Sequence, residues 1–101
     1  MKFLSNYTFL VEFSHALLFE KKVKDELIPF TNAIKGVEKC SFYRLITEIE
    51  TDGQNLSLQL YFDSETNFKA FEQAQKVKML TILDQQFSGQ YVYFQSLLEA
   101  I

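Results

Sequence analysis

The 101-residue chain has no Trp, one Cys, one His, one Pro and three Gly. One Cys cannot form an internal disulfide, and one Cys with one His cannot supply the nitrogen and sulfur ligands of a structural zinc site. Three separated glycines form no glycine-rich phosphate loop, and no nucleophile elbow presents a Ser or Cys. These absences exclude most metal-cluster, haem, nucleotide and hydrolase sites. We therefore expect no cofactor and no metal ion.

Positive charge is also scarce. Lys and Arg number 10 against 13 Asp and Glu, which gives a net charge of −3, and the longest basic run is Lys21-Lys22. Such a chain lacks the basic surface that binds phosphate backbones. The apolar stretches are far shorter than the roughly 20 residues that span a bilayer, and polar residues interrupt any signal-peptide core near the N-terminus. We expect no nucleic-acid or membrane partner, and a lone Cys40 fits the reducing cytoplasm.

The apolar content is ample: 48% of the residues are hydrophobic and 16% are aromatic. A chain of this length forms one small domain, residues 1–101, and buries a core without disulfides or metal.

The first half of the chain predicts a strand, a helix and a second strand. Residues 3–13 alternate with a period of two, which is typical of a strand. After Ser14, a preferred N-cap, apolar residues recur every three or four positions, which predicts a helix that kinks or ends near Pro29. Gly36 closes the connection, and residues 38–50 alternate again as a long strand.

The second half repeats this order. Asp52-Gly53 turns the chain into a strand over residues 56–62, and Asp63-Ser64 provides the next helix cap. Helical spacing then continues to Gly89 through Phe68, Phe71, Ala74, Val77, Leu80, Leu83 and Phe87. Residues 91–98 read as the last strand. The order β-α-β-β-α-β predicts an α+β, ferredoxin-like fold, with an antiparallel sheet in strand order 4-1-3-2 and two helices on one face.

Alternation assigns the strand residues to two faces. The set expected to face the helices is Phe9, Val11, Phe13, Phe42, Ile46, Leu56, Leu58, Leu60, Val92, Phe94 and Leu98. The set expected on the open face is Thr8, Leu10, Tyr43, Leu45, Thr47, Ser57, Gln59, Tyr61, Tyr91, Tyr93 and Gln95. An open face this rich in aromatic side chains normally finds a partner. We therefore expect a homodimer.

Three stretches resemble a known family: Leu27-Ile28-Pro29-Phe30, Ser57-Leu58-Gln59-Leu60-Tyr61-Phe62, and the ending Tyr93-Phe94-Gln95-Ser96-Leu97-Leu98-Glu99-Ala100-Ile101. The chain is similar to short bacterial proteins that carry a domain of unknown function related to the dimeric α/β-barrel group. The resemblance implies the fold and dimerisation. The wider group includes cofactor-independent monooxygenases, haem-degrading enzymes and isomerases, several of which use a Trp, Asn or His in the barrel cavity. This chain has no Trp, and its one His starts the first predicted helix.

The candidate site residues are those of the open face. Tyrosines suit both a dimer interface and a pocket wall, so the site would comprise Thr8, Leu10, Tyr43, Leu45, Gln59, Tyr61, Tyr91 and Tyr93. His15 and Arg44 are polar contributors. His15 sits at a helix start, which favours the neutral ring, and Arg44 either turns to the open face or lies on an edge strand. Glu48, Glu50 and Asp52 more simply form a solvated edge than a cation site.

Three functions stay open on this evidence. The first is a small homodimeric binding or accessory protein that holds an apolar or aromatic ligand between the sheets. The second is a cofactor-independent oxygenase or isomerase, with Arg44 holding an anionic substrate and His15 carrying a proton. The third is a protein-interaction adaptor that uses the same face.

Overall fold

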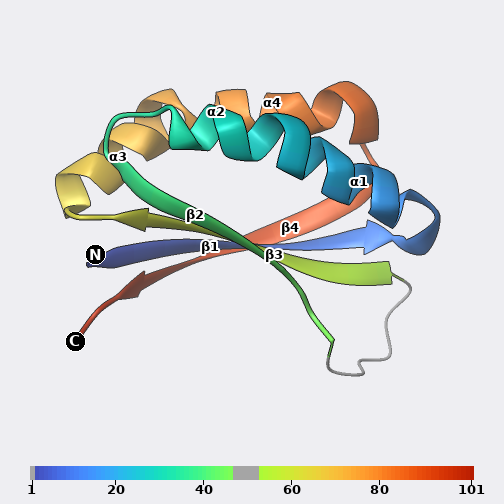
Figure 1. Ribbon diagram of the computed structural model, residues 1–101, viewed down its shortest axis with the longest axis horizontal. Helices are drawn as coiled ribbons and strands as arrows, with labels where there is room; N and C mark the ends of the chain where they lie inside the picture. The colour runs from blue at the N-terminus through green and yellow to red at the C-terminus, as the bar shows by residue number, and fades with distance from the viewer. Residues whose placement is uncertain (1, 47–52) are drawn as a thin grey trace.

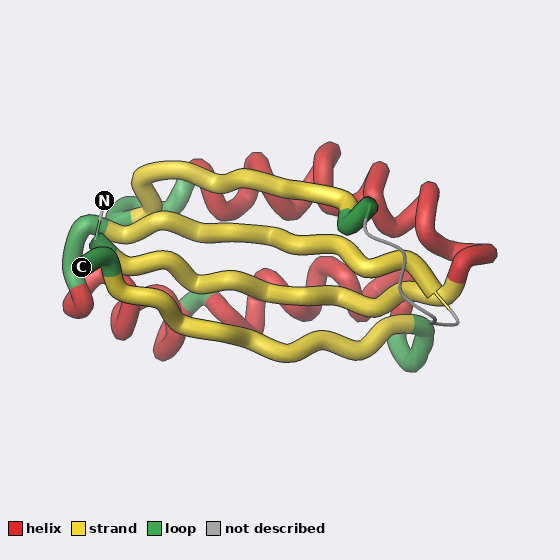
Figure 2. Tube along the Cα trace, turned by 90° about the horizontal axis from the view of Figure 1, so that it is seen from below, coloured by secondary structure: helices red, strands yellow, loops and turns green. Residues whose placement is uncertain are grey.

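The sheet is the organising element of the computed structural model, which describes residues 2–46 and 53–101. Its strands are β1 (Phe3–Glu12), β2 (Val37–Arg44), β3 (Gly53–Phe62) and β4 (Tyr91–Glu99). The spatial order is β2-β3-β1-β4, and every neighbouring pair is antiparallel. This confirms the predicted ferredoxin-like architecture and strand order. All helices cover one face of the sheet and leave the other bare (Figures 1 and 2).

The first helical segment is continuous but irregular. A 3-10 turn, Phe13–His15, precedes α1 (Ala16–Lys22), and a π-helical turn, Val23–Leu27, leads into α2 (Ile28–Asn32). Ser14 therefore lies inside the 3-10 turn instead of capping the helix. Pro29 occupies the first turn of α2, where its missing N–H and its ring are tolerated. The wide turn before Pro29 thus lets the chain stay helical where the sequence predicted a kink or an end.

The second helical segment is divided. Ser64 caps α3 (Glu65–Ala74) through its hydroxyl, which accepts a hydrogen bond from the Asn67 N–H at 3.1 Å, as predicted. Gln75 then separates α3 from α4 (Lys76–Phe87). This break shifts the phase of the helical pattern. Met79 is consequently buried. Val77 is exposed, although uninterrupted helical spacing predicts that it faces the core.

The core lies between the sheet and the helices. Fully buried side chains from β1 and β3 meet apolar side chains from both helical segments: Tyr7, Phe9, Val11, Phe19, Val23, Leu27, Leu56, Leu58, Leu60, Phe62, Phe71, Met79, Leu83 and Phe87. Phe9 packs edge-on against Phe19, which in turn packs edge-on against Phe87. The two central strands therefore supply the helix-facing surface that their alternation predicts.

Two predicted core positions are wrong for a simple reason: they lie beyond the strand ends. Phe13 is in the 3-10 turn after β1 and is 64% exposed, and Ile46 follows the end of β2 and is exposed. Outside a paired strand, alternation no longer orients a side chain. The predicted second strand also extended to residue 50, and residues 47–52, with Thr47, Glu48, Glu50 and Asp52, lie outside the described part of the chain.

The faces of β4 are the main correction. Tyr91 pairs with Val11, Tyr93 with Phe9 and Gln95 with Tyr7. The three β1 residues of these pairs face the helices. Directly opposed residues of paired strands point to the same side of a sheet. Tyr91, Tyr93 and Gln95 therefore face the helices, and the alternate β4 residues occupy the open face: Val92, Phe94, Ser96 and Leu98.

The physical reason for this reversal is that β4 has no informative alternation at its start. Residues 91–94 are all apolar or aromatic, so either register would bury apolar surface. The polar ends of the β4 side chains select one of these two registers. The Tyr91 hydroxyl donates to Asp84 of α4 at 2.7 Å, and the Gln95 amide reaches acceptors on the helix side.

Candidate functional site

The open face consists of four short rows that cross the sheet. Strand pairing places these residues side by side: Lys39-Tyr61-Leu4-Leu98, Ser41-Gln59-Asn6-Ser96, Tyr43-Ser57-Thr8-Phe94, and Asn55-Leu10-Val92, next to Leu45. No helix of the described chain covers them (Figure 2). The expected residues Thr8, Leu10, Tyr43, Leu45, Gln59 and Tyr61 are thus brought together, whereas Tyr91 and Tyr93 are not.

The centre of the open face is a chain of hydrogen bonds, here called the polar ladder. Tyr61 donates to Gln59 at 2.8 Å, Gln59 to Ser57 at 3.4 Å, Ser57 to Asn6 at 2.5 Å, and Asn6 to Thr8 at 3.1 Å. The ladder crosses from β3 to β1, the two central strands. Each of these side chains therefore makes at least one hydrogen bond within the ladder, which lowers the cost of covering them with another surface.

Apolar side chains border the polar ladder on both sides. On β4, Val92, Phe94 and Leu98 are exposed, and on the β2 side Tyr43 and Leu45 are exposed. Exposed apolar side chains that gather on one face mark contact surfaces more often than scattered ones do. The open face therefore combines apolar margins with a paired polar centre.

A shallow hollow lies at the β2 side of the ladder. It has a volume of about 340 Å³, and its walls include Thr8, Tyr43, Leu45, Asn55, Ser57 and Gln59. The hollow thus brings together one end of the polar ladder and the apolar margin of β2.

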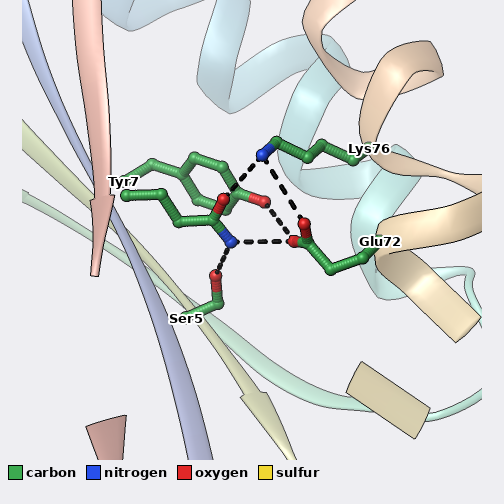
Figure 3. Close-up of polar contacts among 5 residues, drawn as sticks. Ser5, Tyr7, Glu72 and Lys76 are labelled. Atoms are coloured by element: carbon green, nitrogen blue, oxygen red, sulfur yellow. Dashed lines mark hydrogen bonds and ion pairs between the residues drawn. The ribbon is translucent and has the colours of Figure 1, made fainter. Parts of the chain in front are cut away.

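The opposite face of β1 and β4 carries a second polar cluster, beneath the helices (Figure 3). Gln95 Nε2 donates to Ser5 Oγ and to Glu72 Oε1, both at 2.8 Å. Lys76 Nζ donates to Gln95 Oε1 at 2.7 Å, and the Tyr7 hydroxyl donates to Glu72 at 3.3 Å. The cluster joins β4 and β1 to the region where α3 meets α4.

Tyr7 and Tyr91, on the helix side, are held as neutral donors. Burial, together with the Glu72 carboxylate, raises the pKa of Tyr7 well above its ordinary value. Burial and the Asp84 carboxylate raise the pKa of Tyr91 in the same direction. The polar groups of Ser5, Gln95 and Glu72 bond to one another across the cluster. The cluster is therefore a paired internal network that secures β4.

Arg44 lies on the edge strand β2, as expected, and faces the helix side. Its Nη2 donates to Glu20 Oε1 of α1 at 2.5 Å, and Glu20 is only 7% exposed. The Glu20 carboxylate raises the pKa of Arg44 further. The guanidinium of Arg44 is therefore already engaged by a carboxylate of the same chain.

His15 ends the 3-10 turn that follows β1. Its Nε2 lies 3.5 Å from Glu12 Oε2, which is an ion pair when the ring is protonated. In the described part of the chain, no three His, Cys, Asp or Glu side chains come together as metal ligands. None of the helices in that part combines the length and the apolar character needed to cross a membrane.

Sequence reasoning missed several residues that the structure makes prominent. Asn6 was not selected, although it sits beside Thr8 in the alternation of β1 and shares its face. Val92, Phe94 and Leu98 were assigned to the core. Glu72 and Lys76 carry an ordinary helical i, i+4 spacing that resembles a solvated pair, and their link to Gln95 is visible only in the fold.

Comparison with solved structures identifies the same fold elsewhere. HapK from Hahella chejuensis has a TM-score of 0.70 at 15% identity, covering 100% of this chain and 93% of that protein. SnoaB from Streptomyces nogalater, a cofactor-independent oxygenase, has a TM-score of 0.69 at 17% identity, covering 99% of this chain and 93% of that protein. A dimeric ferredoxin-like protein from an uncultured marine organism has a TM-score of 0.60 at 12% identity, covering 100% of this chain and 97% of that protein.

At these identities the likeness shows the fold alone. A comparison with curated protein sequences found no significant match. A family model matches residues 2–101, which is nearly the whole chain, and confirms the resemblance drawn from its three sequence stretches. The chain belongs to the family described as domain of unknown function DUF4286.

Proposed function

We propose that this protein is a homodimeric binding or accessory protein that holds a small, mostly apolar ligand between two stacked sheets. The observation that carries the proposal is the open face, which exposes Val92, Phe94 and Leu98 beside a paired polar ladder. A second copy of the chain is the occupant that best matches such a surface.

The size of the open face fits a dimer interface. Strands of 8 to 10 residues are on average about 30 Å long at roughly 3.3 Å per residue, and four strands at roughly 4.8 Å are about 19 Å wide. The flat area is about 600 Å², and the relief of the side chains enlarges it toward the roughly 800 Å² per partner of ordinary stable interfaces. Stacking two open faces would thus bury enough surface for a stable pair.

The chemistry of the face supports the same proposal. The apolar margins on β2 and β4 supply hydrophobic surface to the interface, while each ladder side chain enters it with at least one hydrogen bond already made. A solved structure with this fold is described as dimeric, which adds support for a pair of copies.

The oxygenase or isomerase alternative gains no specific support from the site. It assigned Arg44 to hold an anionic substrate and His15 to carry a proton if a partner subunit brings it close. Arg44 is held by Glu20, and His15 lies beside Glu12. The adaptor alternative predicts that the open face stays uncovered between copies of this chain.

Sedimentation velocity over micromolar concentrations tests the proposal. We expect a dimer for the natural chain and a monomer for Ser57→Arg, which places a charge at the centre of the face. Thr81→Arg, on the exposed surface of α4, is the matched control and should stay dimeric. Thermal melts verify that each variant folds. A natural chain that remains monomeric, or a dimer that Ser57→Arg leaves intact, contradicts the proposal.

A further inference from the structure

The hollow on the open face has a wall that is polar on one side and apolar on the other. Thr8 and Ser57 line its ladder side, and Tyr43 and Leu45 line its β2 side. Its volume of about 340 Å³ in a single copy lies at the lower end of the roughly 300 to 1,000 Å³ of small-molecule sites. In the proposed dimer the facing copy would roof the hollow.

Among the described residues that line it, the hollow offers a ligand no cation without a partner. Arg44 also lines it, but the guanidinium of Arg44 is bound by the carboxylate of Glu20 on the helix side of the sheet. Lys39, the charged residue of the open-face rows, lies over the ring of Tyr61 at the far end of the ladder. An anionic ligand would therefore lose its hydration without gaining an ion pair, and an uncharged ligand is favoured.

The donors and acceptors of the polar ladder indicate which group a ligand must supply. Along the ladder, the oxygens of Gln59, Ser57, Asn6 and Thr8 each accept one hydrogen bond. The Thr8 hydroxyl, at the end of the ladder, donates to no acceptor within the described residues. Asn6 and Gln59 each donate one amide N–H along the ladder, and the second N–H of each meets no acceptor in the part of the chain that the structure describes.

Unused donors become costly once the face is covered, because a buried N–H or O–H without an acceptor loses its bond to water. Second lone pairs on oxygens that are already bonded are tolerated more easily. The covered hollow therefore needs an acceptor oxygen near Thr8.

We propose that the hollow binds an uncharged, mostly apolar molecule that offers a carbonyl oxygen to the Thr8 hydroxyl, with its apolar body against Tyr43 and Leu45. This inference rests on the proposed function, since the ligand lies between the sheets. It specifies the chemical class: a neutral carbonyl compound, in preference to a hydrocarbon or a carboxylate.

Three tricyclic probes of similar shape test this class: fluorene, fluorenone and fluorene carboxylate. Binding to the full chain is followed by NMR amide chemical shifts, and the oligomeric state is measured by sedimentation in the same samples. We expect fluorenone to bind about three- to tenfold more tightly than fluorene, the range of one neutral hydrogen bond, and the carboxylate to bind most weakly. The shifts should centre on Thr8, Tyr43 and Ser57.

Thr8→Val removes the donor and keeps the shape of the side chain. We expect it to abolish the preference for fluorenone over fluorene while leaving the affinity for fluorene within about twofold. Thr81→Val on α4 is the matched control and should keep the preference. The inference is overturned if fluorene binds as tightly as fluorenone, if the carboxylate binds most tightly, if Thr8→Val weakens both neutral probes equally, or if no probe binds.

The two proposals fail in distinguishable ways. A dimer that shows no preference for fluorenone refutes the ligand class and leaves the dimer standing. A monomer refutes the proposed function, whereas the fluorenone preference and its loss in Thr8→Val can still be read on the uncovered hollow.

Discussion

Phe94 provides the sharpest test of the open face, because sequence and structure assign it to opposite sides of the sheet. Alternation placed Phe94 in the core, whereas its pairing with Thr8 places it on the open face, 63% exposed. An aromatic side chain covers about 150–250 Å². Covering the exposed fraction of Phe94 therefore removes about 125 Å² from water, which at about 25 cal/mol per Å² stabilises each copy by about 3 kcal/mol.

Phe94→Ala would remove most of this contribution from both copies of a dimer. Because interface contributions are not additive, we expect a weakening of at least about a hundredfold in the dimer Kd, which is about 2.7 kcal/mol. Sedimentation equilibrium over a concentration series measures this Kd. Urea denaturation at a concentration where the chain is monomeric should show a change in folding stability of less than about 1 kcal/mol.

Phe13→Ala is the matched control. Phe13 has the same side chain and is 64% exposed, but it lies in the turn after β1, outside the open face. It should leave the dimer Kd unchanged. If Phe94→Ala instead costs about 3–5 kcal/mol of folding stability, as for a buried Phe, or if both variants affect the dimer equally, the reasoning about β4 is refuted.

Three further predictions concern both sides of the sheet. Leu58→Asp should unfold the chain because it buries an unpaired charge in the core, whereas Gln59→Asp, on the open face, should mainly weaken dimerisation. Thermal melts and size measurements compare the two variants, and equal effects would contradict the register of β3. Gln95→Leu should lower the free energy of unfolding by about 1–3 kcal/mol because its hydrogen-bond partners, including Glu72, lose a buried bond, and urea titration that shows no loss would contradict the network. The free energy of unfolding should fall as the pH rises above about 10, because the pKa of Tyr7 is raised in the folded state and the unfolded chain loses this proton first. Tyr7→Phe should make the free energy of unfolding depend less steeply on pH in alkaline denaturation, and an unchanged dependence would show that other groups cause it.

Much of the fold was predictable because the central strands carry strong local signals. Buried Leu56, Leu58 and Leu60 alternate with polar residues in β3, so a shift by one residue would expose all three. The order of the elements and the right-handed crossovers then leave one favoured strand order. The Ser64 cap is equally local, since the hydroxyl and the N–H that it binds lie three residues apart.

The helical segments were predictable in extent but not in detail. Apolar spacing identified one helix before Gly36 and another before Gly89, yet it could not show the π-helical turn before Pro29 or the break at Gln75. These irregularities depend on how each helix fits the sheet. The break at Gln75 is what turns Met79 inward and Val77 outward.

The sequence by itself determined the faces of β1 and β3, because Leu56, Leu58 and Leu60 alternate with polar residues in β3, and Tyr7, Phe9 and Val11 make one face of β1 the more apolar one. Only the tertiary structure decided β4, since Tyr91, Val92, Tyr93 and Phe94 offer apolar surface on both sides. There the choice depended on two helix residues that accept hydrogen bonds from the β4 side chains: Asp84, seven residues before Tyr91, and Glu72, 23 residues before Gln95. Hydrogen bonds between a helix and a strand leave no periodic trace in a sequence, so the composition of the open face became visible only once the chain was folded.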